Sequence, residues 1–169
     1  MAASDDPVPL DNCAISACRK AGGWKALAAR YRLETVQEVE REAGTGFQHR
    51  EIIDPRQLRA DVKIHAVAAE DRYDAENEHA DLADLDPGER DLWIHALSRK
   101  GGWILCGPDI ASIHFGVRAG FKDRLVSLEK LFGAIGFKPQ TKLPVHQTEK
   151  WLQSIIAPVA QAMAFDKAR

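Results

Sequence analysis

Three acidic residues stand where carboxylates are seldom found in a folded chain. Asp11 and Asp109 each follow a short apolar segment that has the pattern of a strand. Glu89 lies one helical turn before Trp93, on the stripe of a predicted helix that should face the core. A carboxylate directed toward the interior is costly unless it is paired or binds a cation. Together the three acids predict a site for a divalent metal ion.

Each of these acids also has a simpler explanation. Asp11 and Asp109 could cap the helices that follow them, and Glu89 could interact with the helix dipole in the first turn. The metal-site prediction therefore requires that the three side chains converge. The carboxyl ends of parallel strands lie at the same edge of a sheet, and open α/β folds bind ligands there.

The elements that must position these acids alternate between strand-like and helix-like segments. This order predicts a mostly parallel sheet flanked by helices. Strands are expected near 8–11, 32–34, 62–66, 103–106 and 125–126. Helices are expected at 22–31, 35–43, 70–84, 88–99, 109–119, 127–135 and 146–165.

Length and charge exclude several classes of protein. The 169 residues fit one domain, and no apolar run approaches the ~18 residues that cross a bilayer. The segment 1–6 has two acids and no basic residue, which is unlike a signal peptide, so a cytoplasmic protein is expected. A net charge of -2 lacks the broad basic field of a protein that coats DNA.

Cysteine and histidine spacing gives no sign of a zinc site. The three cysteines form no CxxC pair, and the six histidines show no HxH or HxxxH spacing. His95 is expected to be a surface neighbour of Asp91, four residues earlier. No Ser-His or Cys-His pair for covalent catalysis is evident in the sequence.

Three segments resemble the motifs of PIN domains. Residues 10–16 (LDNCAIS) resemble the opening motif, with an Asp at a strand end and a Ser five residues later. Residues 85–96 (LDPGERDLWIHA) resemble the central acidic helix of that family. Residues 103–109 (WILCGPD) resemble its strand ending in a Thr-x-Asp turn. The resemblance covers residues 8–137 and leaves 138–169 as a C-terminal extension with one helix.

The resemblance implies a three-layer α/β domain with Mg²⁺- or Mn²⁺-dependent endoribonuclease activity. Asp11 and Asp109 would hold the metal, and Glu89 and Glu42 would complete the acidic cluster directly or through water. Carboxylate oxygens are the hard ligands that Mg²⁺ prefers. Hydrolysis would leave a 5′-phosphate and a 3′-hydroxyl, and Ser16 would contact the substrate.

Partners are also implied by the resemblance. Small bacterial members of the family are often the toxins of toxin–antitoxin pairs, so an RNA substrate and an antitoxin protein are expected. A homodimer is expected through the apolar residues of the last helix, which include Trp151, Ile155, Ile156 and Val159. Packing of this helix on its own domain is an equal alternative.

Two of the acids have alternatives in the sequence. On helix 35–43 the site acid is Glu42 or Glu38, and Glu38 is also expected to form a capping box with Thr35 as N-cap. On helix 88–99 it is Glu89 or Asp91. The helical stripe favours Glu42 and Glu89.

The motifs depart from the family at accessory positions. Asn12 and Cys13 follow Asp11 where Thr-Asn is common, and Gly107 replaces the Thr of the last motif. Because such neighbours hold the acids or the metal waters, these changes could reduce metal affinity. A non-catalytic PIN-like module that binds RNA or protein is therefore the alternative function. An unrelated Mg²⁺-dependent phosphatase is a third, but the DxDx[TV]-like motif it needs is absent after the first strand.

Overall fold

Short parallel strands form the centre of the structure. The computed structural model describes residues 5–169. Its three strands are β1 (Val8–Pro9), β2 (Leu33–Val36) and β3 (Lys63–His65), which pair in parallel in the order β1-β2-β3. The predicted α/β class with a parallel sheet is thus confirmed.

Two later segments extend this array beyond β1. Leu10 forms a parallel bridge with Cys106, and Leu105 forms a parallel bridge with Leu125. The Cys106 N–H donates to the Pro9 carbonyl at 2.9 Å. The predicted strand near 103–106 therefore lies beside β1, and the one near 125–126 lies beyond it, both as short bridged segments in an order typical of a doubly wound sheet.

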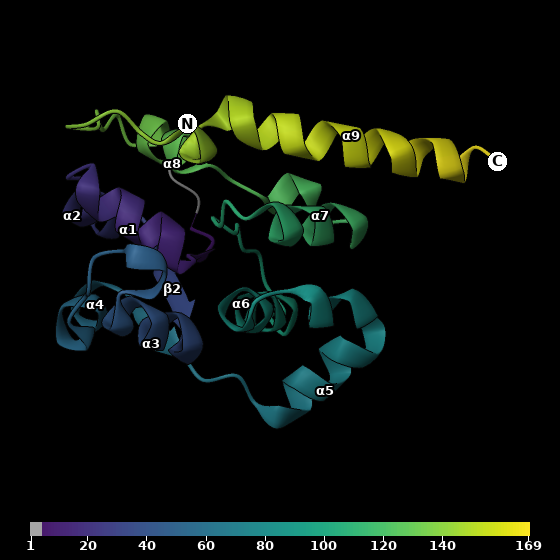
Figure 1. Cartoon of the computed structure of the whole chain (residues 1–169), viewed down its shortest axis with the longest axis horizontal. Coiled ribbons are helices and arrows are strands. Elements are labelled where there is room, and N and C mark those ends of the chain that lie inside the picture. Colours follow the sequence, from purple (N-terminus) through teal and green to yellow (C-terminus); the bar gives the residue numbers. More distant parts are fainter. Residues whose placement is uncertain (1–4) are drawn as a thin grey trace.

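Helices connect these strands and cover them (Figure 1). Residues 5–169 contain nine: α1 (Asn12–Lys20), α2 (Trp24–Ala28), α3 (Gln37–Thr45), α4 (Pro55–Asp61), α5 (Ala69–Glu78), α6 (Pro87–Leu97), α7 (Ile110–Arg118), α8 (Leu128–Ala134) and α9 (Glu149–Lys167). Short 3₁₀ turns lie at Phe47–His49, Ala80–Asp84, Lys122–Arg124 and Val145–Gln147. None of the helices in the part of the chain described here has the length and apolarity needed to cross a membrane.

A cluster of aromatic side chains joins α6 to α7. Trp93 is completely buried, and its ring meets Trp103 and Phe115 edge-on, with ring centroids 5.7 and 5.0 Å away. The Trp93 Nε1–H donates to the Ser112 hydroxyl at 2.8 Å. This contact satisfies the polar atom of the indole inside the core, as buried Trp requires.

The start of α3 differs from the prediction. Thr35 does not cap the helix, because it remains in β2, where its hydroxyl donates to the Leu10 carbonyl at 2.6 Å. Val36 occupies the N-cap position, and Glu38 pairs with Arg41 instead of forming a capping box. The hydroxyl is buried between strands, and the hydrogen bond to a neighbouring strand replaces the local cap.

Two other helix boundaries also differ. A helix, α1, begins directly after Asp11, in a segment that is not among the expected helices. The Asp11 carboxylate accepts the Ala14 N–H and so caps this helix. The acidic segment 70–84 is divided into α5 and a separate 3₁₀ turn, Ala80–Asp84.

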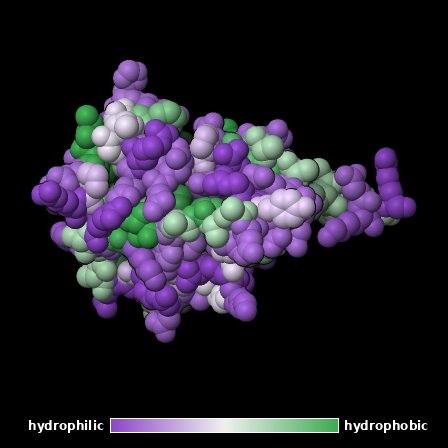
Figure 2. All heavy atoms as spheres, turned by 90° about the horizontal axis from the view of Figure 1, so that it is seen from below, coloured by the Kyte–Doolittle hydropathy of each residue, from purple (hydrophilic) through white to green (hydrophobic). Residues whose placement is uncertain are grey.

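The C-terminal helix packs on its own chain. Leu152 and Ile156 of α9 are buried, and Trp151, Ile155 and Val159 are partly buried against the core. In Figure 1, α9 runs alongside α7, and its last turns reach beyond the rest of the molecule, as Figure 2 also shows. Phe165, 67% exposed, lies on this projecting end. Of the two alternatives for this helix, the structure shows packing on its own domain.

Loss of the Trp93 side chain should be the most damaging single change in this core. Trp93→Ala leaves a large cavity and an unpaired Ser112 hydroxyl, and we expect it to lower the free energy of unfolding by about 3–5 kcal/mol. Tyr73→Ala is the matched control, because Tyr73 is 69% exposed, and its effect should stay within about 0.5 kcal/mol. Urea denaturation measures both. Equal effects of the two changes would contradict this account of the core.

Candidate functional site

Four carboxylates from four different elements line one pocket. Asp11 precedes α1, Glu42 lies on α3, Glu89 lies in the first turn of α6, and Asp109 precedes α7. Asp86 lines the same pocket as a fifth acid. We call these residues and their surroundings the acidic pocket. It lies at the carboxyl ends of β1 and of the bridged segment at Leu105–Cys106.

Local structure explains the two aspartates. Asp11 caps α1 by accepting the Ala14 N–H on Oδ1 at 2.6 Å, and Asp109 caps α7 by accepting the Ser112 N–H on Oδ1 at 3.1 Å. Both residues therefore act as helix caps, the simpler of their two predicted roles. In each case the cap uses Oδ1, so Oδ2 can still face a ligand in the pocket.

A glycine allows Glu42 to reach the pocket. A Cβ atom on Gly88 would lie 2.7 Å from the Glu42 Oε1, which is closer than real Cβ atoms come to another side chain. Without a side chain at Gly88, the Glu42 carboxylate lies against the first turn of α6. The Pro87-Gly88 pair marked only a helix start in the sequence, but Gly88 also has this steric role.

Burial, and to a smaller extent the neighbouring negative charges, disfavour ionisation of the carboxylates in the pocket. Burial raises the pKa of Asp11 to about 7, and the charges of Asp109 and Glu42 add to this, while the Ala14 N–H and Arg50 oppose it. Burial likewise raises the pKa of Glu89 to about 8, with further contributions from Asp109 and Asp11. The pKa of Glu42 is also raised, first by burial. A fully ionised pocket is therefore destabilising until a cation enters it.

The structure separates the alternative acids. Glu42 lines the acidic pocket, whereas Glu38 lies outside its lining and pairs with Arg41, which lowers the pKa of Glu38. Glu89 lines the pocket, whereas Asp91 lies outside it, where Arg72 Nη1 approaches Asp91 Oδ1 at 2.8 Å.

Ser16 has a different position from the one expected of a substrate contact. It is buried on α1, 4% exposed, and it is not among the residues that line the pocket. Ser16 follows Asp11 by five residues, which is more than one helical turn. It lies on the buried face of α1.

Two further residues line the acidic pocket, and the sequence singled out only Cys13 of the two. Arg50 lines it, and its positive charge opposes the rise in the pKa of Asp11. Cys13 lines it too, and its Sγ lies 3.4 Å from His146 Nε2. The two residues are 133 positions apart, so nothing in the sequence indicated their contact, and the contact does not contradict the expectation that no Cys-His pair acts in covalent catalysis. Burial and the charge of Asp11 raise the pKa of Cys13 to about 11, so its thiol stays protonated and is a poor nucleophile.

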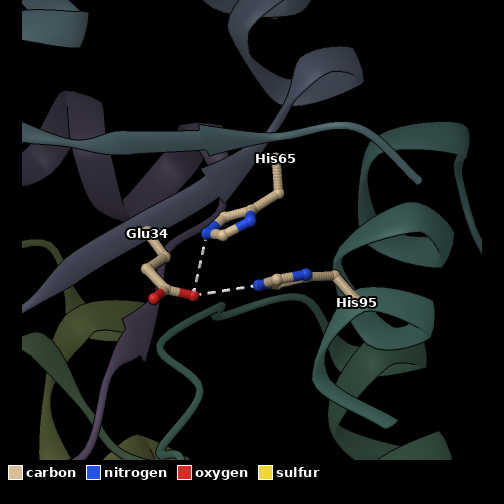
Figure 3. A group of neighbouring side chains, drawn as sticks. All are labelled: Glu34, His65 and His95. Carbon is tan, nitrogen blue, oxygen red and sulfur yellow. Dashed lines mark hydrogen bonds and ion pairs between the residues drawn. The ribbon is translucent and has the colours of Figure 1, made fainter. Parts of the chain in front are cut away.

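A second group of ligand-type side chains lies elsewhere. Glu34, His65 and His95 could hold a metal ion, because their ligand atoms all lie within 4.8 Å of one another (Figure 3). Within residues 5–169 this is the only group of three or more His, Cys, Asp or Glu that meets this distance. The carboxylates of the acidic pocket are more widely spaced, which suits a cation that keeps several of its waters.

This second group corrects two predictions. His95 is not a surface neighbour of Asp91, since it is only 9% exposed and bonds Glu34 on β2. The absence of an HxH or HxxxH motif did not exclude a histidine-containing metal site, because His65 and His95 come from different elements. Burial works against ionisation of Glu34, but the His95 hydrogen bond and Arg99 outweigh it and lower the pKa of Glu34. Burial lowers the pKa of His65, which favours its neutral form.

Burial of Glu89, together with charge repulsion in the acidic pocket, should make the metal-free protein less stable as the pH rises. The pKa of Glu89 is raised from 4.5 to about 8 by folding, so the folded state holds a proton that the unfolded state has lost between these values. Stability should fall as the pH rises through this window. In Glu89→Gln this loss is removed, so the variant should melt progressively higher than wild type between pH 5 and pH 8 in EDTA.

Differential scanning fluorimetry gives the melting temperatures for this comparison. Glu76→Gln, on the exposed surface of α5, is the control and should differ from wild type by the same small amount at both pH values. A difference between Glu89→Gln and wild type that stays constant or shrinks as the pH rises would show that Glu89 is not held in a repulsive, buried environment.

Comparison with known proteins adds no relative to this description. No protein-family model matches the chain, and no curated protein matches it. The resemblance to PIN domains therefore depends on the motifs at 10–16, 85–96 and 103–109 alone. The function of the acidic pocket has to follow from its own geometry and charge.

Proposed function

We propose that the chain is a PIN-type endoribonuclease that uses Mg²⁺ or Mn²⁺ in the acidic pocket. One observation carries this proposal: Asp11, Glu42, Glu89 and Asp109 come from four separate elements and line the same pocket. Helix capping explains why Asp11 and Asp109 lie at this edge of the sheet, but it does not explain why Glu42, inside α3, directs its carboxylate into the same pocket. The order of β3, β2, β1 and the two bridged segments is compatible with a PIN-like layout.

The donors in the pocket fit a hard divalent cation. They are carboxylate oxygens, the ligands that Mg²⁺ and Mn²⁺ prefer. Asn12 also lines the pocket, and both polar atoms of its buried side chain lack a hydrogen-bond partner. Buried amides are normally satisfied, so these two atoms point to a ligand or its water shell. When bound, the cation would supply positive charge that stabilises the phosphate in the transition state.

The residues of the chain would divide the remaining work. The carboxylates hold the cation and position water for attack on phosphorus. Arg50, at the pocket wall, provides a guanidinium that can bind a phosphate oxygen of RNA with two hydrogen bonds. Cys13 stays neutral beside Asp11 and takes no covalent part. The family has Thr at the position of Gly107, so this chain lacks a hydroxyl there. A Cβ atom at Gly107 would lie 3.4 Å from Asp11 Oδ2, so a side chain at this position would be next to the Asp11 carboxylate.

The alternative function is a non-catalytic module that binds RNA or protein. Cys13 and Gly107 favour it, because neither offers the hydroxyl or amide that usually holds the metal waters in this family. The unsatisfied Asn12 amide favours the catalytic function, because it gives the pocket a polar group beside Asp11 that still lacks a partner. An antitoxin that blocks the pocket is the partner we expect for the catalytic form.

Asp109→Asn should abolish metal-dependent cleavage while preserving the fold. The change keeps size and shape, and the amide oxygen can still cap α7, but the charge that attracts the cation is lost. We expect the rate of RNA cleavage with Mg²⁺ or Mn²⁺ to fall by roughly a hundredfold or more. Gel-based cleavage of a mixed RNA pool, with and without EDTA, measures this.

The matched control is Asp91→Asn. Asp91 faces Arg72 outside the acidic pocket, so this variant should cleave at a rate close to wild type. Cleavage by Asp109→Asn at the wild-type rate would show that the acidic pocket is not the active site. If wild type shows neither metal-dependent cleavage nor Mg²⁺ or Mn²⁺ binding by calorimetry, the non-catalytic module becomes the better proposal.

We also propose a homodimer, formed through the projecting end of α9. Most apolar residues of this helix are buried in the core or partly buried against it, but Phe165 remains 67% exposed at its C-terminal end. Phe165→Ser should therefore shift a dimer to a monomer without changing the melting temperature greatly. Light scattering over a hundredfold range of concentration measures the mass. A wild-type mass that stays monomeric throughout would contradict the dimer.

A further inference from the structure

Glu34, His65 and His95 form a compact group away from the acidic pocket. Glu34 lies on β2, His65 is the last residue of β3, and His95 lies on α6. None of the three lines the acidic pocket. Figure 3 shows both histidines directed at the same oxygen of Glu34. The group therefore joins the sheet to the helix that covers this part of it.

The distances in this group match those of a metal centre. His95 Nε2 lies 2.9 Å and His65 Nε2 lies 3.2 Å from Glu34 Oε2. Ligand atoms bound to a tetrahedral zinc at about 2.0–2.1 Å lie roughly 3.3 Å from one another. The three ligand atoms all lie within 4.8 Å of one another, so side-chain rotations are needed to bring them around one ion.

Hydrogen bonding alone does not account for both histidines. His95 forms a hydrogen bond with Glu34, but the buried His65 Nε2 has no hydrogen-bond partner, although it faces the same oxygen. The two imidazole rings are stacked, with centroids 4.1 Å apart. This arrangement holds both Nε2 atoms toward one carboxylate and leaves one of them unsatisfied, which a bound cation would correct.

The Arg99 guanidinium lies next to Glu34 and His95, where a metal ion would bind. Its Nη1 donates to Glu34 Oε2 at 2.6 Å and lies 3.4 Å from His95 Nε2. The Arg99 side chain is 21% exposed, so it has a route to solvent. A metal ion would have to displace this guanidinium from Glu34, and the two positive charges would compete for one carboxylate.

We propose that Glu34, His65 and His95 bind a first-row transition-metal dication, with Zn²⁺ as the best-matched ion. Two imidazoles and one carboxylate suit Zn²⁺ or Co²⁺, whereas Mg²⁺ prefers oxygen ligands alone. Three protein ligands leave a fourth position for water. The site is separate from the acidic pocket and does not depend on the ribonuclease proposal. Its ligands would tie the edge strand β3 to α6, so the bound ion should stabilise the fold.

Zn²⁺ binding by the purified full-length chain tests this proposal. In excess Mg²⁺, which occupies the oxygen ligands of the acidic pocket, calorimetry should show one Zn²⁺ bound, and Co²⁺ should give visible d–d absorption typical of a nitrogen-ligated ion. His65→Gln should weaken Zn²⁺ binding by more than about tenfold, because it removes one of three ligands. His114→Gln, on α7, is the control and should bind as wild type does. His95→Gln should weaken Zn²⁺ binding in the same way. Circular dichroism verifies that each variant is folded, and if His95→Gln does not fold, the binding measured for His65→Gln is the test of the site.

The competition with Arg99 provides a readout that adventitious binding would not give. Arg99→Gln removes a positive charge 2.6 Å from the ligand oxygen, so Zn²⁺ should bind more tightly by roughly tenfold. Asp109→Asn should leave Zn²⁺ binding unchanged, which distinguishes this site from the acidic pocket. No Zn²⁺ binding by wild type, or binding that is insensitive to His65→Gln, would overturn the proposal.

Discussion

The position of the Asp11 backbone and side chain controls how the rest of the site is built. Its N–H donates to the Cys106 carbonyl at 3.2 Å, which joins β1 to the bridged segment before α7. Its carboxylate caps α1 while facing the other acids. One residue thus joins the sheet, starts a helix and contributes charge to the acidic pocket. The cost is a buried carboxylate whose pKa is raised to about 7.

Helix α6 connects this pocket to the interior and to the second group of ligands. Its first turn contributes Glu89 and, through Gly88, the space that Glu42 occupies. One turn later Trp93 anchors the helix in the core, and His95 reaches Glu34 on β2. A movement of α6 would therefore alter both groups, because the same rigid helix carries residues of each.

The two groups differ in the cation that they suit. The acidic pocket offers widely spaced oxygens and an unsatisfied amide, which match a hydrated, hard ion. The second group offers two imidazole nitrogens and one carboxylate, from Glu34, His65 and His95, and these ligand atoms lie close together. The negative charge of Glu34 is already paired with Arg99. Nitrogen ligands at this spacing match a transition metal that is bound directly by the protein. This difference follows from donor chemistry and spacing.

Local pattern predicted the strands and most of the helices, although not α1 or α4, and it offered helix capping as one of two roles for Asp11 and Asp109. Periodicity and capping depend on neighbours a few residues apart, so they are visible in the sequence. The preference for Glu42 over Glu38 also followed from the helical stripe. Only the tertiary structure decided that Thr35 bonds Leu10 and that His95 meets Glu34 and His65. Those contacts join residues far apart in the chain, and their formation depends on how the strands and α6 pack.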